Sequence, residues 1–140
     1  MISGGYVDAK KHSGGLLQVD YKSGHYLWLQ FRPQTTFLLS QYGSGYIGLG
    51  FGWEWYLTKQ IIIIPSFTPG VYWKGNGKNL GHPIEFRSAL EISYEMENKI
   101  RIGIQISHIS NAHLSHKNPG LNALTLCLGI PLNFSFCKIF

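Results

Sequence analysis

Charge is scarce in this sequence of 140 residues. Charged side chains make up 14% of it, against about 25% in a typical soluble domain, whereas 44% of the residues are hydrophobic and 14% are aromatic. This apolar content excludes an intrinsically disordered chain. The net charge of +5 favours anionic surfaces, including those of phosphate-bearing lipid and nucleic acid. Because no recognised nucleic-acid-binding motif accompanies the charge, we expect no nucleic-acid partner.

Long hydrophobic runs and a cysteine framework are missing as well. The longest purely apolar run covers residues 61–64, far short of the roughly 20 residues that a transmembrane helix needs. The N-terminus has neither the basic start nor the apolar core of a signal peptide, so the sequence as shown encodes no export signal. Cys127 and Cys137 leave both a single bridge and two thiols open. No spacing of His, Cys, Asp and Glu resembles a metal site, so we expect no metal.

The dominant pattern in the sequence is an alternation of apolar and polar residues, which predicts β-strands. It is clearest over residues 99–110, where Ile100, Ile102, Ile104 and Ile106 occupy every second position. The same alternation covers residues 17–22, 47–55, 84–96 and 123–130. Glu97 and Asn98 lie between two long alternating runs and predict a tight hairpin. No helical period or linker interrupts the pattern, which predicts a single domain over residues 1–140 with about eight strands.

Two architectures can bury such strands, and they differ in the side to which the apolar face points. In a soluble barrel or sandwich it points inward, and in a membrane barrel it faces lipid. The apolar faces here carry large residues such as Trp53 and Trp55, while the opposite faces combine Gly and Ala with ionisable groups of both signs. We therefore predict an all-β fold, an eight-stranded antiparallel transmembrane β-barrel. The alternative is a soluble β-barrel that carries small apolar ligands.

Polar residues extend two of these apolar stripes. His108 and Ser110 share the face of the isoleucine stripe, and Asn122 shares the face of Leu124 and the alternate residues after it. A loop over residues 111–121 would return the chain beside itself, where facing side chains of antiparallel strands are about 5 Å apart. We therefore expect His108, Ser110 and Asn122 to cluster on an apolar surface. The alternative is an ordinary polar rim of a barrel.

The clustered residue types suit hydrolysis of an ester. A serine hydroxyl is a weak nucleophile that needs a base, and histidine can accept its proton. The second imidazole nitrogen needs a hydrogen-bond partner, a place that asparagine fills in some hydrolases. Asn111 and nearby backbone N–H groups could hold the developing oxyanion.

Three segments carry a resemblance to a known family. Residues 108–112 (His-Ile-Ser-Asn-Ala), together with Asn118-Pro119-Gly120 and the upstream residues 77–88, are similar to the lipid A 3-O-deacylase (PagL-type) family of outer-membrane acyl hydrolases. The resemblance implies an eight-stranded barrel in the bacterial outer membrane, in contact with outer-membrane lipid. It also implies an esterase that removes the acyl chain at position 3 of lipid A in lipopolysaccharide, without a cofactor.

The resemblance also implies a role for each site residue. Ser110 would be the nucleophile, His108 the catalytic histidine, and the Asn111 side chain with a backbone N–H at about His113 the oxyanion contributors. The third catalytic member is a glutamate in the best-known enzymes and falls at Asn122 here. Asparagine can orient a histidine but cannot neutralise an imidazolium. The departure keeps open a second interpretation, a non-catalytic outer-membrane barrel with a degenerate site.

Overall fold

The computed structural model describes residues 2–8 and 14–132, which form nine antiparallel strands and one short 3₁₀ helix. The strands are β1 (Ile2–Asp8), β2 (Gly14–Lys22), β3 (Phe31–Ser40), β4 (Gly45–Trp53), β5 (Trp55–Tyr56), β6 (Ile61–Trp73), β7 (Ile84–Glu95), β8 (Arg101–Ser110) and β9 (Leu121–Gly129). The helix η2 (Trp28–Gln30) lies in the connection between β2 and β3.

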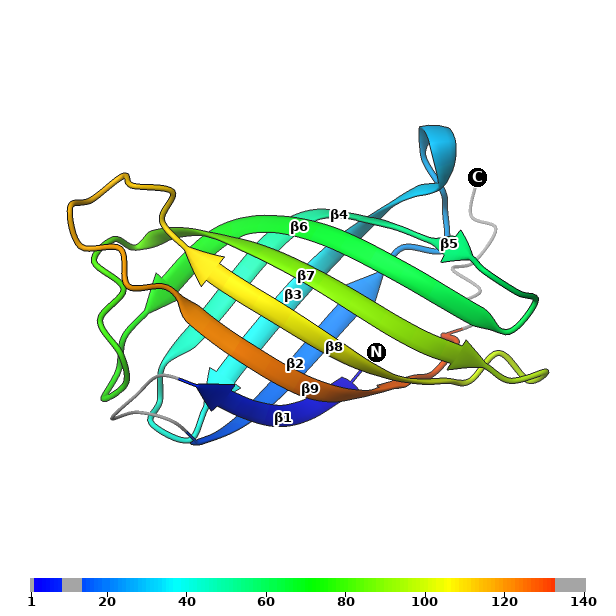
Figure 1. The fold of residues 1–140 in the computed structure, drawn as a ribbon, viewed down its shortest axis with the longest axis horizontal. Helices are drawn as coiled ribbons and strands as arrows, with labels where there is room; N and C mark the ends of the chain where they lie inside the picture. The colour runs from blue at the N-terminus through cyan, green and yellow to red at the C-terminus, as the bar shows by residue number, and fades with distance from the viewer. Residues whose placement is uncertain (1, 9–13, 133–140) are drawn as a thin grey trace, which may run out of the picture.

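The strands close into a barrel. Each long strand pairs with its neighbours in the chain, β1 pairs with β9, and the β4–β6 pairing completes the ring (Figure 1). The two residues of β5 keep the register of β4, since Gly52 pairs with Ser66 and Trp55 pairs with Ile63. The described residues therefore build eight long strands, and the predicted eight-stranded antiparallel barrel is confirmed.

Most strand boundaries differ from the sequence prediction by one to three residues, and two of the differences have a clear physical reason. The predicted strand over residues 99–110 begins at Arg101, because Lys99 adopts a φ of 68° in the turn after Glu97 and Asn98. The predicted strand over residues 47–55 is interrupted at Glu54, whose side chain turns into the barrel and is fully buried. The hairpin at Glu97 and Asn98 itself is confirmed by the pairing of β7 with β8.

The apolar faces of the strands point outward. On β8, Ile102, Ile104 and Ile106 are each at least half exposed, whereas Gln105 and Ser107 between and after them are buried. The same alternation runs along β7 and β9. A barrel with an apolar wall and a polar, ionisable interior is the arrangement of a membrane barrel and not of a soluble one. In the described part of the chain, no helix is long and apolar enough to span a membrane.

The two ends of the interior are filled differently. At the end where β8 stops, a cluster of apolar side chains fills the lumen; its buried members are Leu16, Leu38, Tyr46, Tyr72, Leu80, Ile109 and Leu121. Ile109 and Leu121 are direct partners on β8 and β9, so this cluster fixes the two strand ends that carry the predicted site. Cys127 is buried on the inner face of β9, and Cys137 lies outside the described residues.

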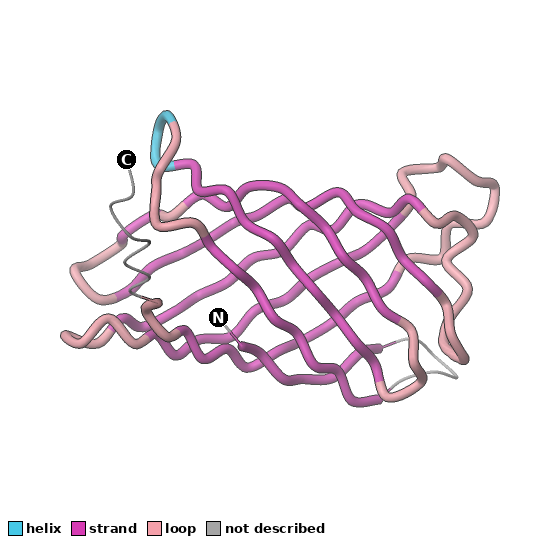
Figure 2. The backbone as a smooth tube through the Cα atoms, turned by 180° about the vertical axis from the view of Figure 1, so that it is seen from behind, coloured by secondary structure: helices cyan, strands magenta, loops and turns pink. Residues whose placement is uncertain are grey.

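At the opposite end, charged side chains fill the lumen. Glu54 accepts hydrogen bonds from Arg32 Nη1 at 2.5 Å and Arg101 Nη1 at 2.7 Å. Arg101 also donates from Nε to Glu95 at 2.8 Å, and Lys99 donates to the same carboxylate at 2.8 Å. We call these five residues the lumen ion cluster. It links β3, β7 and β8 across the interior of the barrel. Figure 2 shows the backbone of the barrel from the side opposite to that seen in Figure 1.

Candidate active site

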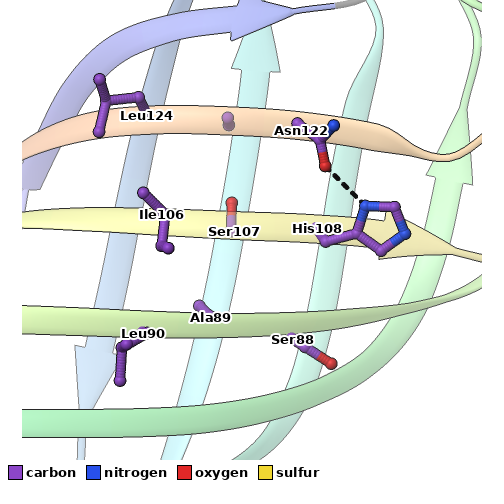
Figure 3. Close-up of a pocket in the computed structure, with 9 residues that line it drawn as sticks. Ser88, Ala89, Leu90, Ile106, Ser107, His108, Asn122 and Leu124 are labelled. Atoms are coloured by element: carbon purple, nitrogen blue, oxygen red, sulfur yellow. Dashed lines mark hydrogen bonds between the residues drawn. The ribbon is translucent and has the colours of Figure 1, made fainter.

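The candidate site lies on the outer wall, where β8 ends and β9 begins. His108 and Asn122 are direct partners in the β8–β9 pairing, and both side chains are exposed on the outer face. Asn122 Oδ1 lies 2.7 Å from His108 Nδ1 (Figure 3). The antiparallel register therefore joins two residues that are separated by a whole loop in the sequence.

The bond to Asn122 decides which nitrogen of His108 can act as a base. An amide oxygen can only accept, so Nδ1 carries the hydrogen and Nε2 keeps its lone pair. The ring projects toward the end of β8 and away from Ile106, as Figure 3 shows. Gly120 packs against the ring: a Cβ on this residue would lie 2.6 Å from His108 Cε1, and its φ is +69°. The ring is thus held between Asn122 and a position that requires glycine.

Ser110 shares the outer face with His108 and is the last residue of β8. It is partly exposed and pairs with Phe86 on β7. In the described part of the chain, no hydrogen bond joins the Ser110 hydroxyl to His108. The structure therefore brings His108 and Asn122 into contact, and Ser110 lies two residues after His108 on the same face of β8. Figure 3 shows the His108 ring projecting toward this end of the strand.

Asn111 turns inward and is fully buried. Its Nδ2 donates to the backbone oxygen of Leu80 at 3.0 Å and to that of Lys117 at 2.7 Å, while its backbone N–H donates to Asn118 Oδ1 at 3.0 Å. Both amide hydrogens are therefore used inside the protein. In this arrangement the Asn111 side chain holds the loop in place and has no hydrogen to offer an oxyanion, contrary to the expectation from the sequence.

The backbone after Asn111 offers other donors. Ala112 and His113 adopt φ values of 50° and 63°, a conformation that costs energy for residues with a side chain and that clusters at functional sites. Among the described residues, the backbone N–H groups of Ala112 and His113 have no acceptor. Successive N–H groups in such a turn form a concave anion-binding surface. The His113 side chain is exposed and takes no part in this surface.

The loop over residues 111–120 is fixed against the loop between β6 and β7. Lys78 Nζ donates to the backbone oxygen of Gly120 at 2.6 Å. Gly81 has a φ of +93° and packs against the backbone of Lys117 so closely that a Cβ would lie 2.0 Å from its oxygen. The segment that includes Lys78, Leu80 and Gly81 therefore supports the site from the neighbouring loop.

A cavity of about 560 Å³ runs along the outer wall beside His108. Its outward side chains come from three strands: Ser88 and Leu90, Ile106 and His108, and Asn122 and Leu124 (Figure 3). The volume lies in the usual range for small-ligand sites, about 300 to 1,000 Å³. Its mostly apolar lining suits an acyl chain. No group of three or more possible metal ligands occurs among the described residues.

Sequence reasoning missed Ser88, although a signal for it was present. Ser88 is the polar residue in an otherwise apolar outward stripe on β7, just as His108 interrupts the stripe on β8. Ser88 therefore shares with His108 and Asn122 the property of being a polar residue at an outward position of an apolar stripe.

The comparisons agree with this fold. A family model described as lipid A 3-O-deacylase (PagL) matches residues 10–131. A solved crystal structure, described as that of the outer membrane enzyme PagL, superposes with a TM-score of 0.70 at 17% sequence identity. The match covers 94% of this chain and 100% of that one, and at this identity it shows a common fold. No individual curated protein matches the sequence.

Proposed function

The chain belongs to the lipid A 3-O-deacylase (PagL) family of outer-membrane enzymes, and on that premise we propose that Ser110, His108 and Asn122 carry out the hydrolysis. Lipid A is the substrate, and the bond that breaks is the ester at position 3. Ser110 acts as the nucleophile, His108 as the base and then the acid, and Asn122 as the residue that orients His108.

The reaction follows from the chemistry of these groups. His108 Nε2 takes the Ser110 proton as Oγ attacks the ester carbonyl, and the backbone N–H groups of Ala112 and His113 stabilise the resulting oxyanion. The protonated imidazole then gives its proton to the sugar oxygen, which leaves as a hydroxyl. Water, activated by the same nitrogen, cleaves the acyl-serine and releases the fatty acid. In this proposal Asn111 shapes the loop and does not touch the oxyanion.

One observation carries the proposal: the 2.7 Å hydrogen bond between Asn122 and His108 on the lipid-facing wall. A histidine of an ordinary polar rim would be solvated and would not need an oriented ring. Here Asn122 fixes the tautomer and Gly120 leaves room for the ring. The adjoining apolar cavity lets the acyl chain bind while the lipid stays in the membrane.

A second candidate function, a barrel that binds lipid without hydrolysing it, is favoured by Asn122 alone. The amide keeps the tautomer but has no charge to stabilise the imidazolium that forms during the reaction. This candidate predicts normal folding and lipid binding without acyl release.

Mass spectrometry of lipid A tests the two candidates. The protein, folded in detergent, is expected to remove the 3-linked acyl chain, and Ser110→Ala is expected to abolish the loss while the barrel stays folded. Thr35→Val is the matched control, because it removes an outward hydroxyl from β3 on the opposite wall of the ring. Full activity in Ser110→Ala would eliminate the mechanism, and an inactive wild-type protein that binds lipid A would establish the second candidate.

A further inference from the structure

Ser88 stands out on the lipid-facing side of β7. The other outward side chains of this strand are large and apolar: Ile84, Phe86, Leu90, Ile92 and Tyr94. Ser88 is exposed among them, and no hydrogen bond of its hydroxyl is found within the described residues. A hydroxyl that faces lipid without a partner is unfavourable, so its position calls for a partner outside the protein.

The register places Ser88 in the candidate site. Ser88 pairs with His108, and His108 pairs with Asn122, so the three side chains form one row across β7, β8 and β9. Directly opposite side chains are about 5 Å apart, whereas residues two apart along a strand are separated by roughly 6.6 Å. Ser88 is therefore at least as close a neighbour of His108 as Ser110 is. All three residues of the row line the outer-wall cavity.

Ser88 is poorly placed to be the nucleophile itself. It lies within β7, whose backbone pairs with β6 through Phe67 and with β8 through His108. The backbone N–H groups around it belong to these ladders, so no donors remain for an oxyanion. Ser110, by contrast, lies two and three residues before Ala112 and His113, whose backbone N–H groups have no acceptor among the described residues.

We propose that Ser88 is a substrate-binding residue that positions the acylated lipid over Ser110 and His108. Its hydroxyl donates a hydrogen bond to a carbonyl oxygen of the bound lipid next to the ester that breaks. Figure 3 shows the Ser88 hydroxyl and the His108 ring projecting toward the same end of the sheet. The lipid would thus be held at two points: its reacting ester beyond His108 and a second carbonyl at Ser88. This assignment rests on the proposed function of the site.

Steady-state kinetics with detergent-dispersed lipid A tests the assignment. We expect Ser88→Ala to raise KM about tenfold with kcat within about threefold of wild type, the effect of losing a single hydrogen bond to bound substrate. Ser88→Thr, which keeps the hydroxyl, is expected to restore most of the affinity, and Thr35→Val on the opposite wall is expected to change neither constant. An unchanged KM in Ser88→Ala would overturn the proposal.

Two further measurements separate this proposal from the hydrolytic mechanism. Binding of intact lipid A is measured in the Ser110→Ala background, with and without Ser88→Ala, and is expected to weaken about tenfold with the second substitution. Because this measurement needs no turnover, it tests Ser88 even if the protein hydrolyses nothing. Labelling with an alkyl fluorophosphonate is expected to modify Ser110. An adduct on Ser88 would instead make Ser88 the nucleophile and overturn the positioning role.

Discussion

Two polar clusters lie on opposite sides of the barrel wall, one in the lumen and one on the outer face, and they are built in opposite ways. Glu54, Glu95 and Arg101 of the lumen ion cluster are buried, whereas Lys99 lies exposed at its edge, and each acidic residue contacts two cationic side chains. The outer-wall row of Ser88, His108 and Asn122 is exposed on the apolar face and contains one hydrogen bond within the row.

This difference in burial and pairing indicates that the lumen ion cluster stabilises the barrel and that the outer-wall row serves function. Buried charges are tolerated only when they are paired, so breaking an ion pair of the lumen ion cluster should lower the stability of the barrel. The outer-wall row leaves polar atoms without partners on a surface that otherwise faces lipid, which lowers stability and gains nothing in packing. Residues that break a local rule without structural compensation mark functional sites. Substitutions in the two clusters should therefore separate activity from stability.

The largest effect is expected from His108→Leu. The substitution removes the proposed base, so we expect acyl release to fall at least about 10³-fold. Stability should stay the same or rise, because leucine continues the outward stripe of Ile102, Ile104 and Ile106. Lipid A mass spectrometry measures the first quantity, and urea unfolding of the barrel in detergent measures the second. A marked loss of stability would mean that His108 has a structural role, and it would contradict the assignment of the outer-wall row to function.

The reverse pattern is expected for Arg101→Met in the lumen. Breaking a buried pair costs about 3 to 5 kcal/mol, and we expect about 3 kcal/mol because Arg32 still contacts Glu54 and Lys99 still contacts Glu95. Activity per folded molecule should not change, since the lumen ion cluster lies at the other end of the barrel from the site. Urea unfolding and folded-fraction-corrected activity are the measurements. Loss of activity without loss of stability would contradict the assignment.

Gly120→Ala should have an intermediate effect on activity. The new methyl group would lie 2.6 Å from His108 Cε1, in a backbone conformation with φ of +69° that alanine adopts only with strain. We expect the ring to be displaced from Asn122 and acyl release to fall about 10- to 100-fold, with a stability loss of about 1 kcal/mol. Gly43→Ala is the control, because Gly43 also has a positive φ (76°) but nothing lies within 4 Å of an added Cβ. Equal activity losses in the two variants would show that backbone strain alone is responsible.

The fold was predictable because nearly every strand repeats the same alternation, and the register follows once one face is apolar. β6 was harder to recognise, since Pro65 and Pro69 interrupt the β4–β6 ladder, and proline ordinarily argues against a strand between two partners. Parity also placed His108, Ser110 and Asn122 on one face. The alternation within a strand and the face on which a residue lies depend only on residues close together in the chain, so both can be read from the sequence.

The loop after Ser110 was not predictable in the same way. The inward turn of Asn111 depends on Leu80, a residue more than thirty positions away whose backbone oxygen it binds. Motif and spacing suggested an oxyanion role for its amide, but only the packing of the two loops shows that its hydrogens are occupied. The positive φ value at Ala112 likewise has no signature in its residue type, because an alanine rarely adopts that conformation.

Asn122→Asp tests whether a negative charge beside His108 would increase the rate of hydrolysis. The carboxylate has nearly the size of the amide and can accept the same bond from His108 Nδ1, which is now 2.7 Å long. Its charge would stabilise the imidazolium, so we expect kcat to rise about tenfold. Asn122→Leu, which removes the acceptor, should lower kcat. A fall in kcat for the aspartate variant would show that the amide is suited to this site and that added charge is not what it lacks.

The smallest effect concerns Tyr26, which lies beside the lumen ion cluster in the connection between β2 and β3. Its hydroxyl donates to Glu54 at 2.8 Å, and burial, followed by that hydrogen bond, raises the pKa of Tyr26 from 10.0 to about 12. A raised pKa means that the neutral form is favoured in the folded protein. The resulting stability is fully present below about pH 10 and is lost as the pH rises toward 12.

Tyr26→Phe should therefore make the stability of the protein depend less on pH on the alkaline side. At pH 7 the expected change is only the small loss of the hydrogen bond to Glu54, about 1 kcal/mol. Urea midpoints measured from pH 8 to 12 in wild type and variant, with Tyr21→Phe as a control on the outward face of β2, give the comparison. The same alkaline slope in all three proteins would mean that Tyr26 does not stabilise the lumen ion cluster through its neutral hydroxyl.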